Sequence, residues 1–205
     1  MTRLFAFGTL AAFLFVHPAP AAAQTAPGPL VSTEWVQQHL KDPKVRIIAT
    51  GDEGRYTRGH IPGARFVEHM DTVNMSGGHR ALAADVLAPI FAKAGLTDGV
   101  HVVLYGDSPM TTGWVYMTMA STGHGSDISF LDGSAELWRD EGRPIETTTP
   151  PPAAGTLTLR SFTDMAVDAQ YVRERLQSPD VRILDVRTTT EWNNGHLPGA
   201  TLILW

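Results

Sequence analysis

Arg187 is the side chain of this sequence that is best suited to hold an anion. A guanidinium is planar, permanently charged and able to grip an oxyanion through two parallel N–H groups. Arg187 follows Val181–Val186, a segment rich in Val, Ile and Leu, so we expect it at the end of a short buried strand. The matching position in an earlier, similar segment is Gly51. A charge in only one of two similar segments favours an anion-binding pocket there, and the alternative is a surface arginine that is ion-paired with Glu191.

Two histidines, His60 and His196, lie in the motifs Gly-His-Ile-Pro-Gly-Ala and Gly-His-Leu-Pro-Gly-Ala. In such a tight turn, a histidine that hydrogen-bonds the backbone is expected rather than a catalytic or metal-binding one. The other histidines show no paired spacing of the kind that metal ligands have. We therefore predict neither a metal site nor a cofactor.

The sequence contains no cysteine in its 205 residues, which excludes thiol catalysis and cysteine-type zinc sites within them. Ser108 is a poor candidate nucleophile, because Gly106-Asp107-Ser108-Pro109-Met110 lacks the glycines of a nucleophile elbow and Pro109 suits the start of a helix. Thr111-Thr112-Gly113 could form an anion-accepting helix start, and simple capping is the alternative. We predict no catalytic residue in this chain.

These residues belong to two similar segments. A shift of 136 positions places Val45-Arg46-Ile47-Ile48 on Val181-Arg182-Ile183-Leu184 and one Gly-His-X-Pro-Gly-Ala motif on the other. One offset that holds over this length predicts a duplicated unit. Each copy is expected to begin with a helix, which Ser32 or Thr33 can cap in the first copy. Strands are expected at Val45–Ala49 and Arg65–Val67, and at Val181–Val186 and Thr201–Leu204.

The first copy continues with alternating helices and strands. Apolar spacing predicts helices at Leu82–Ala94, Met110–Thr122 and Ser134–Glu141, and strands at Val100–Tyr105 and Ile128–Leu131. In the last two of these helices, the side chains that we expect to pack into the core of the domain are Trp114, Val115, Met117, Met119 and Trp138. The alternation predicts an α/β fold in which helices cover both faces of a parallel sheet.

The predicted organisation is a first domain at 28–146, a Pro-rich linker at 147–155 and a second domain at 156–205. Residues 156–205 hold one helix and about two strands, too few to enclose a core. We therefore expect the sequence to be a fragment that ends inside its second domain.

The first 23 residues are expected to be a signal peptide. Arg3 precedes the short apolar run Leu4–Val16, and Ala21-Ala22-Ala23 allows cleavage before Gln24; an uncleaved anchor is the alternative. The net charge of −5 and the scattered basic residues argue against binding to nucleic acid or a membrane surface. We expect a soluble periplasmic or secreted protein, with no membrane contact after cleavage.

The repeated Gly-His-X-Pro-Gly-Ala turn resembles that of the tandem rhodanese-like sulfurtransferases. Val102-Val103-Leu104-Tyr105 is similar to the strand that precedes the active-site loop of this family, and Phe130-Leu131-Asp132-Gly133 with Gly142-Arg143-Pro144 to its closing strand and helix. Leu184-Asp185-Val186-Arg187 is similar to a strand end of the second domain in this family. The resemblance covers about residues 30–205 and implies the rhodanese-like fold.

The resemblance implies a two-step sulfur transfer between small molecules. A cysteine thiolate takes a sulfane sulfur from thiosulfate or 3-mercaptopyruvate, and the persulfide passes it to cyanide or a thiol. Backbone N–H groups of the active-site loop and the following helix N-terminus lower the thiol pKa and hold the anionic donor. Arg187 matches an arginine that helps to bind this donor.

In tandem members the cysteine usually lies in the second domain, and the first domain is catalytically silent. Here Gly106 or Asp107 stands where the first loop begins, and neither can carry sulfur. By the duplication offset, we expect the second loop near position 242 or so, outside this sequence. Two other functions stay open: a thiol-free binding or regulatory module, and a relic of a truncated gene.

Overall fold

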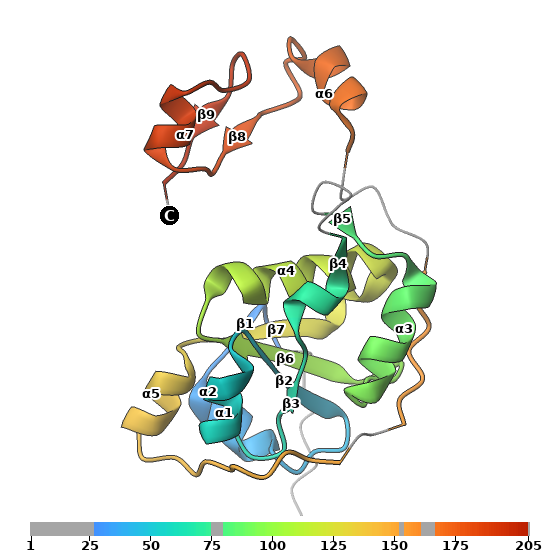
Figure 1. Cartoon of the computed structure of the whole chain (residues 1–205), viewed down its shortest axis with the longest axis vertical. Coiled ribbons are helices and arrows are strands. Elements are labelled where there is room, and N and C mark those ends of the chain that lie inside the picture. The colour runs from blue at the N-terminus through green and yellow to red at the C-terminus, as the bar shows by residue number, and fades with distance from the viewer. Residues whose placement is uncertain (1–26, 75–79, 152–153, 161–166, 205) are drawn as a thin grey trace, which may run out of the picture.

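The computed structural model describes residues 27–74, 80–151, 154–160 and 167–204. The signal peptide predicted at 1–23 lies outside the described residues. We call residues 27–160 the first unit and residues 167–204 the second segment (Figure 1). No helix among the described residues is long and apolar enough to cross a membrane.

Five parallel strands form the sheet of the first unit, in the order β1-β7-β6-β2-β3 (Figure 1). Their bounds are Leu30–Val31 (β1), Val45–Thr50 (β2), Arg65–Phe66 (β3), His101–Gly106 (β6) and Ile128–Leu131 (β7). The central strands β2 and β6 pair along their whole length, from Val45↔His101 to Thr50↔Gly106. Their near-continuous apolar sequences suit strands that are covered on both faces.

Helices cover both faces of this sheet (Figure 1). One face carries α1 (Thr33–His39), α2 (Glu53–Arg58) and α5 (Ala135–Asp140), and the other carries α3 (Ala84–Lys93) and α4 (Pro109–Met119). Successive strand residues point to opposite faces. Ile47 therefore joins the cluster of Trp138 from α5, whereas Ile48 joins that of Phe91 from α3. The predicted α/β class and parallel sheet are confirmed.

Shorter elements connect these layers. The 3-10 turn His69–Thr72 and the antiparallel pair β4 (Val73–Asn74) and β5 (Arg80–Ala81) lie between β3 and α3. The π turn Ala120–His124 and the 3-10 turn Gly125–Asp127 lead from α4 to β7.

Side-chain caps determine where the helices begin. Ser32, Asp52, Ser108 and Ser134 precede α1, α2, α4 and α5, and each accepts a hydrogen bond from a backbone N–H of the first turn. Of the two predicted caps of α1, the structure uses Ser32. Helix α2 was not predicted, because it is short and only Tyr56 in it is buried.

The prediction that Met117 of α4 lies in the core is wrong. Met117 is 39% exposed, whereas Val115 and Met119 are buried. Residues three, four and seven apart share a helix face, so Thr112, Val115 and Met119 face the sheet, and Met117 lies two positions from either apolar neighbour on another face. Trp114 is half-buried, and Trp138 in α5 is buried as predicted.

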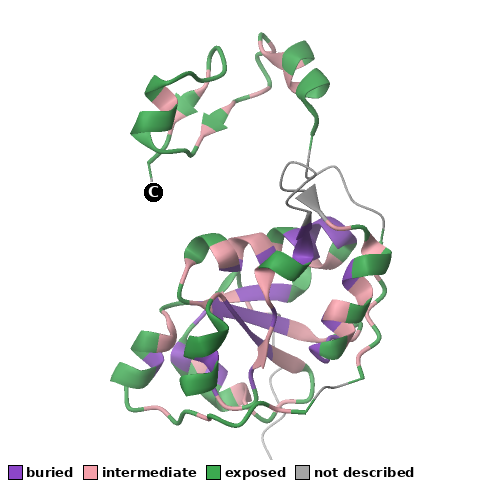
Figure 2. Ribbon diagram, viewed as in Figure 1, coloured by how far each residue is buried: buried purple, intermediate pink, exposed green. Residues whose placement is uncertain are grey.

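The second segment contains α6 (Ala169–Arg175), β8 (Leu184–Asp185), α7 (Thr189–Asn193) and β9 (Thr201–Leu202). Strands β8 and β9 pair at Leu184↔Thr201, and β2 and β3 pair at Ile48↔Arg65, each residue 136 positions earlier. None of the described residues 167–204 is buried (Figure 2). These strands are shorter than predicted, because β8 has β9 as its one partner among the described residues, whereas β2 is paired on both sides.

Residues 154–160 lie against the rest of the first unit. Gly155 and Arg160 donate their backbone N–H groups to carbonyls of α3 and of the π turn, over 3.0 and 3.1 Å. The hydroxyl of Thr158 donates to Asp98 over 2.6 Å. The side chains that add apolar contacts with the cluster of α3 and α4 are Leu157 and Leu159. Residues 156–160, which the sequence assigned to the second domain, thus pack on the first.

Candidate functional site

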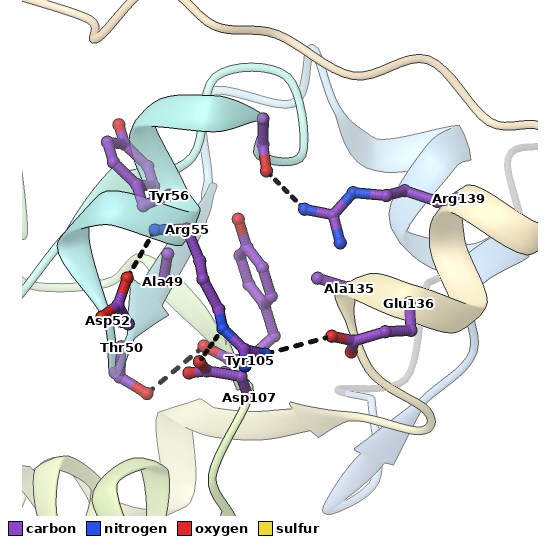
Figure 3. A pocket seen from close by; sticks show the side chains of 12 residues that line it. Ala49, Thr50, Asp52, Arg55, Tyr56, Tyr105, Asp107, Ala135, Glu136 and Arg139 are labelled. Carbon is purple, nitrogen blue, oxygen red and sulfur yellow. Dashed lines mark hydrogen bonds and ion pairs between the residues drawn. The ribbon is translucent and has the colours of Figure 1, made fainter.

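A small pocket opens where β2 and β6 end, beside α2 and α5 (Figure 3). The carboxyl ends of parallel strands are the usual ligand-binding edge of an α/β sheet. The residues that line the pocket are Ala49, Thr50, Asp52, Arg55, Tyr56, Gly59, Tyr105, Gly106, Asp107, Ala135, Glu136 and Arg139. Both residues that the sequence placed at the start of the first loop, Gly106 and Asp107, are among them.

Arg55 lies between two carboxylates in this pocket (Figure 3). Its Nε is 3.2 Å from Oδ2 of Asp107, and its Nη1 is 3.6 Å from Oε1 of Glu136. The hydrogen bond from Ser134, helped by the nearby guanidinium groups, lowers the pKa of the Glu136 carboxyl. Glu136 is therefore an anion at neutral pH. The pocket has a carboxylate–guanidinium–carboxylate chain across it.

Gly106 is one of the two residues that the sequence placed at the start of the first loop, and the space beside its Cα is filled. A Cβ on Gly106 would lie 2.5 Å from the hydroxyl oxygens of Thr50 and of Thr112, and 2.8 Å from the Thr50 carbonyl. The two hydroxyls are 2.8 Å apart and hydrogen-bonded to each other. No side chain fits at position 106 unless these groups move.

Two buried tyrosines, Tyr56 and Tyr105, line the pocket. The hydroxyl of Tyr105 accepts a hydrogen bond from the N–H of Ile61 over 3.2 Å, and that of Tyr56 donates to the carbonyl of Ala64 over 2.8 Å. Burial raises the pKa of both phenols, so both stay protonated at neutral pH. Their contacts hold the turn that follows α2 and supply no base.

Arg187 lies at the end of β8, and its ion-pair partner is Asp185. Its Nε and Nη2 donate to the two carboxylate oxygens over 3.0 and 2.6 Å, and Nη2 also donates to the carbonyl of Gly195 over 2.8 Å. These hydrogen bonds lower the pKa of Asp185 and raise that of Arg187. The predicted alternative partner, Glu191, instead accepts hydrogen bonds from the N–H and hydroxyl of Thr188 in a capping box. Among the described residues, none accepts a hydrogen bond from Nη1 of Arg187.

The two motif histidines make the same contacts. Nδ1 of His60 lies 2.8 Å from the carbonyl of Tyr56, and Nδ1 of His196 lies 3.1 Å from that of Trp192. Each ring stacks on that aromatic ring, at 3.9 and 3.6 Å between centroids. Both histidines thus hydrogen-bond the backbone, as the sequence indicates. The described residues contain no cluster of three His, Asp or Glu side chains that could hold a metal ion.

The hydroxyl groups near the start of α4 make capping contacts. Ser108 accepts from the N–H of Thr111, and the hydroxyls of Thr111 and Thr112 donate to the carbonyl of Ser108 over 3.0 Å each. Ser108 is therefore the cap of α4, and no basic side chain takes part in these contacts.

Sequence reasoning did not find Arg55, Glu136 or Asp185. Arg55 and Glu136 meet through the fold, and neither lies in a recognisable motif. Asp185 carried a signal, because residues two apart on a strand share a face and Asp185 stands two positions before Arg187.

A rhodanese-like domain model matches this chain over residues 32–141 and again over residues 168–204. The chain therefore belongs to the rhodanese-like domain family, which confirms the resemblance seen in the sequence.

Two bacterial proteins are similar to this chain in sequence. The sulfur carrier protein TtuD of Thermus thermophilus is 28% identical over 201 residues, which cover 87% of this chain and 70% of that protein. A thiosulfate sulfurtransferase of Azotobacter vinelandii is 27% identical over 182 residues, which cover 83% of this chain and 66% of that protein. Among solved structures, SseA of Escherichia coli, described as a 3-mercaptopyruvate sulfotransferase, has a TM-score of 0.74 at 20% identity and covers 87% of this chain and 76% of that one. At this identity the likeness shows the fold alone.

Proposed function

We propose that this chain is part of an exported sulfurtransferase. The substrates would be thiosulfate or 3-mercaptopyruvate as donor, and cyanide or a thiol as acceptor. The family match and the relatives named thiosulfate sulfurtransferase support this proposal. Because the sequence has no cysteine, the thiolate of the proposal lies outside these 205 residues, and the chain alone is expected to be inactive.

The proposed chemistry balances without an added oxidant. The thiolate attacks the outer sulfur of thiosulfate, an S–S bond to the enzyme forms, and sulfite leaves with the electrons of the broken S–S bond. With 3-mercaptopyruvate the C–S bond breaks instead, and the methylene carbon takes the thiol proton to give pyruvate. Cyanide or a second thiolate then attacks the outer persulfide sulfur. Thiocyanate or a new persulfide forms, and the enzyme thiolate is released.

The observation that carries the proposal within this chain is the setting of Arg187. Asp185 and the carbonyl of Gly195 orient its guanidinium, and Nη1 keeps its N–H groups without an acceptor among the described residues. An oriented guanidinium with open donors suits an oxyanion such as thiosulfate. The first unit has Gly51 at the corresponding position, which supports a silent first domain.

The closing of position 106 supports the same division of roles. Thr50 and Thr112 fill the space that a side chain at Gly106 would need. We propose residues 28–146 as the catalytically silent domain, although residues 156–160 pack on it. Residues from 167 onward would then begin the domain that binds the donor.

An activity assay tests the proposal. The chain from Gln24 to Trp205, given thiosulfate and cyanide, should release no thiocyanate above background. A longer gene product should turn over, and alanine in place of its cysteine should abolish the rate; an unchanged rate would end the enzyme hypothesis. In that product, Arg187→Gln should raise the KM for thiosulfate about tenfold or more, and Arg182→Gln, an arginine five positions earlier in the sequence, should not.

Export is a separate part of the proposal. The layout of residues 1–23 supports a cleaved leader. Amino-terminal sequencing of the protein recovered from a periplasmic fraction should begin at Gln24. A product that keeps Met1 and stays with the membrane would favour the uncleaved anchor.

The second candidate is a binding or regulatory module without a thiol. The absence of cysteine and the filled space at Gly106 favour it. A longer gene product with a complete second domain and no cysteine would decide for the module.

A further inference from the structure

The carboxylate of Asp107 lies inside the pocket of the first unit, and its side chain is only 19% exposed. One oxygen, Oδ2, pairs with Nε of Arg55 over 3.2 Å. The other, Oδ1, lies directly against the backbone of Gly51, where a Cβ would collide with it. Gly51 has φ of 104°, a conformation that glycine adopts readily and other residues avoid. The turn after β2 is thus shaped around this carboxylate.

The surroundings of Asp107 are those that would attract an external anion. It stands at the carboxyl ends of β2 and β6, just before Pro109 opens α4, and the amino end of a helix carries a positive potential. Arg55 adds a full positive charge on the other side (Figure 3). A carboxylate of the protein itself already occupies this place.

The second segment has a different charge arrangement at the same positions. Gly51 corresponds to Arg187, and Arg55 corresponds to Glu191. An arginine at position 51 would displace the Asp107 carboxylate from the backbone that it contacts. The first unit therefore holds an anion of its own where the second segment presents a cation.

We propose that Asp107 is an internal anion that closes the pocket of the first unit to thiosulfate and other sulfur oxyanions, with Arg55 as its counter-ion. The choice of sulfur oxyanions rests on the proposed function. The added claim is that this pocket rejects anions by its own charge, independently of any thiol.

Two other charged side chains of the pocket, Asp52 and Arg139, bond to backbone groups, so Arg55 is the counter-ion of Asp107. Asp52 accepts the backbone N–H of Arg55 over 2.6 Å as the cap of α2, and Arg139 donates to the carbonyl of Gly59 over 2.7 Å. Removal of the Asp107 charge leaves Arg55 facing Glu136 alone. Removal of both charges leaves the Arg55 guanidinium without either of its ion-pair partners.

The test uses two variants of the chain from Gln24 onward. One carries Asp107→Asn, and the other carries both Asp107→Asn and Glu136→Gln. Thiosulfate and sulfate are titrated, and NMR follows the backbone amides of residues 51–55 and 107–112. The parent chain should show no saturable shifts at these amides. Asp107→Asn should bind, and the double variant should bind about tenfold more tightly.

Three further variants fix the interpretation. Asp140→Asn removes an exposed carboxylate from the same unit and should leave the pocket closed. Arg55→Gln added to Asp107→Asn should abolish the new binding, because it removes the cation. Asp107→Ser removes the charge and also frees the space that the carboxylate fills, so it serves if the asparagine variant lacks a native circular dichroism spectrum or binds no anion. Folded variants that bind no better than Asp140→Asn would overturn the proposal.

The Nε–H signal of Arg187, followed in the longer gene product that contains the second active-site loop, separates this proposal from the proposed function. If thiosulfate moves that signal but leaves the pocket amides of the Asp107 variants unchanged, the internal anion is wrong and the donor role of Arg187 stands. If only the pocket amides move, the reverse holds. If neither responds, both are wrong.

Discussion

The turn around His60 and the turn around His196 allow a direct comparison between the first unit and the second segment. In both, the histidine ring stacks on the aromatic residue four positions earlier and Nδ1 lies within hydrogen-bond distance of its carbonyl. The glycines that follow, Gly63 and Gly199, have φ of 74° and 78°. Yet Ile61 is 1% exposed and Leu197 is 48% exposed. Neighbours in sequence therefore set the turn, whereas distant elements decide its burial.

Arg46 and Arg182 show the same distinction in single side chains. Nη1 of each donates to two carbonyls just before it in the chain. Nε of Arg46 also donates to the carbonyl of Gly95 after α3, over 3.1 Å. Arg182 makes the two local contacts, and none of the described residues far from it in sequence accepts a hydrogen bond from its guanidinium. The second segment thus keeps the local geometry of the first unit without its long-range support.

The largest expected effect comes from the residue after each histidine. Ile61→Ala should lower the free energy of unfolding by about 2–5 kcal/mol, because it leaves a cavity in a packed core. Leu197→Ala should change it by less than about 0.5 kcal/mol, since the side chain is largely in water. Urea unfolding followed by tryptophan fluorescence measures both. Equal effects would show that Leu197 is buried in solution and would break the comparison.

A cysteine at position 106 should have the next largest effect. Gly106→Cys should destabilise the first unit by about 1–3 kcal/mol, because Thr50 and Thr112 occupy the space of its side chain. Gly113→Cys in α4, where a Cβ meets no atom within 4 Å, is the matched control and should not destabilise. Neither variant should release thiocyanate from thiosulfate and cyanide. Turnover by Gly106→Cys would contradict the closed pocket.

A smaller effect is expected from pH. Burial lowers the pKa of His101, whose Nε2 lies 2.9 Å from Oγ of Ser129. The unfolded chain then binds a proton at higher pH than the folded one, so the first unit should be fully stable above about pH 6.5 and lose stability as the pH falls below it. His101→Gln should flatten this slope in urea unfolding. An unchanged slope would assign it to another group.

Much of the first unit was predictable because its signals are local. Runs such as Val100–Tyr105 and Ile128–Leu131 are apolar and bounded by turn residues, and β6 and β7 lie there. Helix spacing similarly located α3 and α5. Met117 was placed wrongly because the pattern gives a helix without fixing which edge of its apolar stripe faces the sheet.

The candidate site was predictable only in part. The motif positions Gly106 and Asp107 were found, since they follow a recognisable strand. Their partners Arg55 and Glu136 were not, because they come from α2 and α5 and meet Asp107 only through the fold. The single-residue comparison of Gly51 with Arg187 found the charge difference but not the carboxylate that fills the space beside Gly51.

The smallest effect on stability is expected at the ion pair of the second segment. Asp185→Asn should leave the unfolding of the first unit unchanged, because both partners of the ion pair belong to the second segment, which has no buried residue among those described. It should nevertheless release the guanidinium of Arg187, whose Nε–H signal should exchange faster with water in NMR. Asp180→Asn, an exposed carboxylate of the same segment, is the control and should leave that signal as it is. A shift in the unfolding of the first unit by Asp185→Asn would mean that the two parts of the chain support each other, and the contrast drawn from His60 and His196 would then hold for single turns but not for the whole second segment.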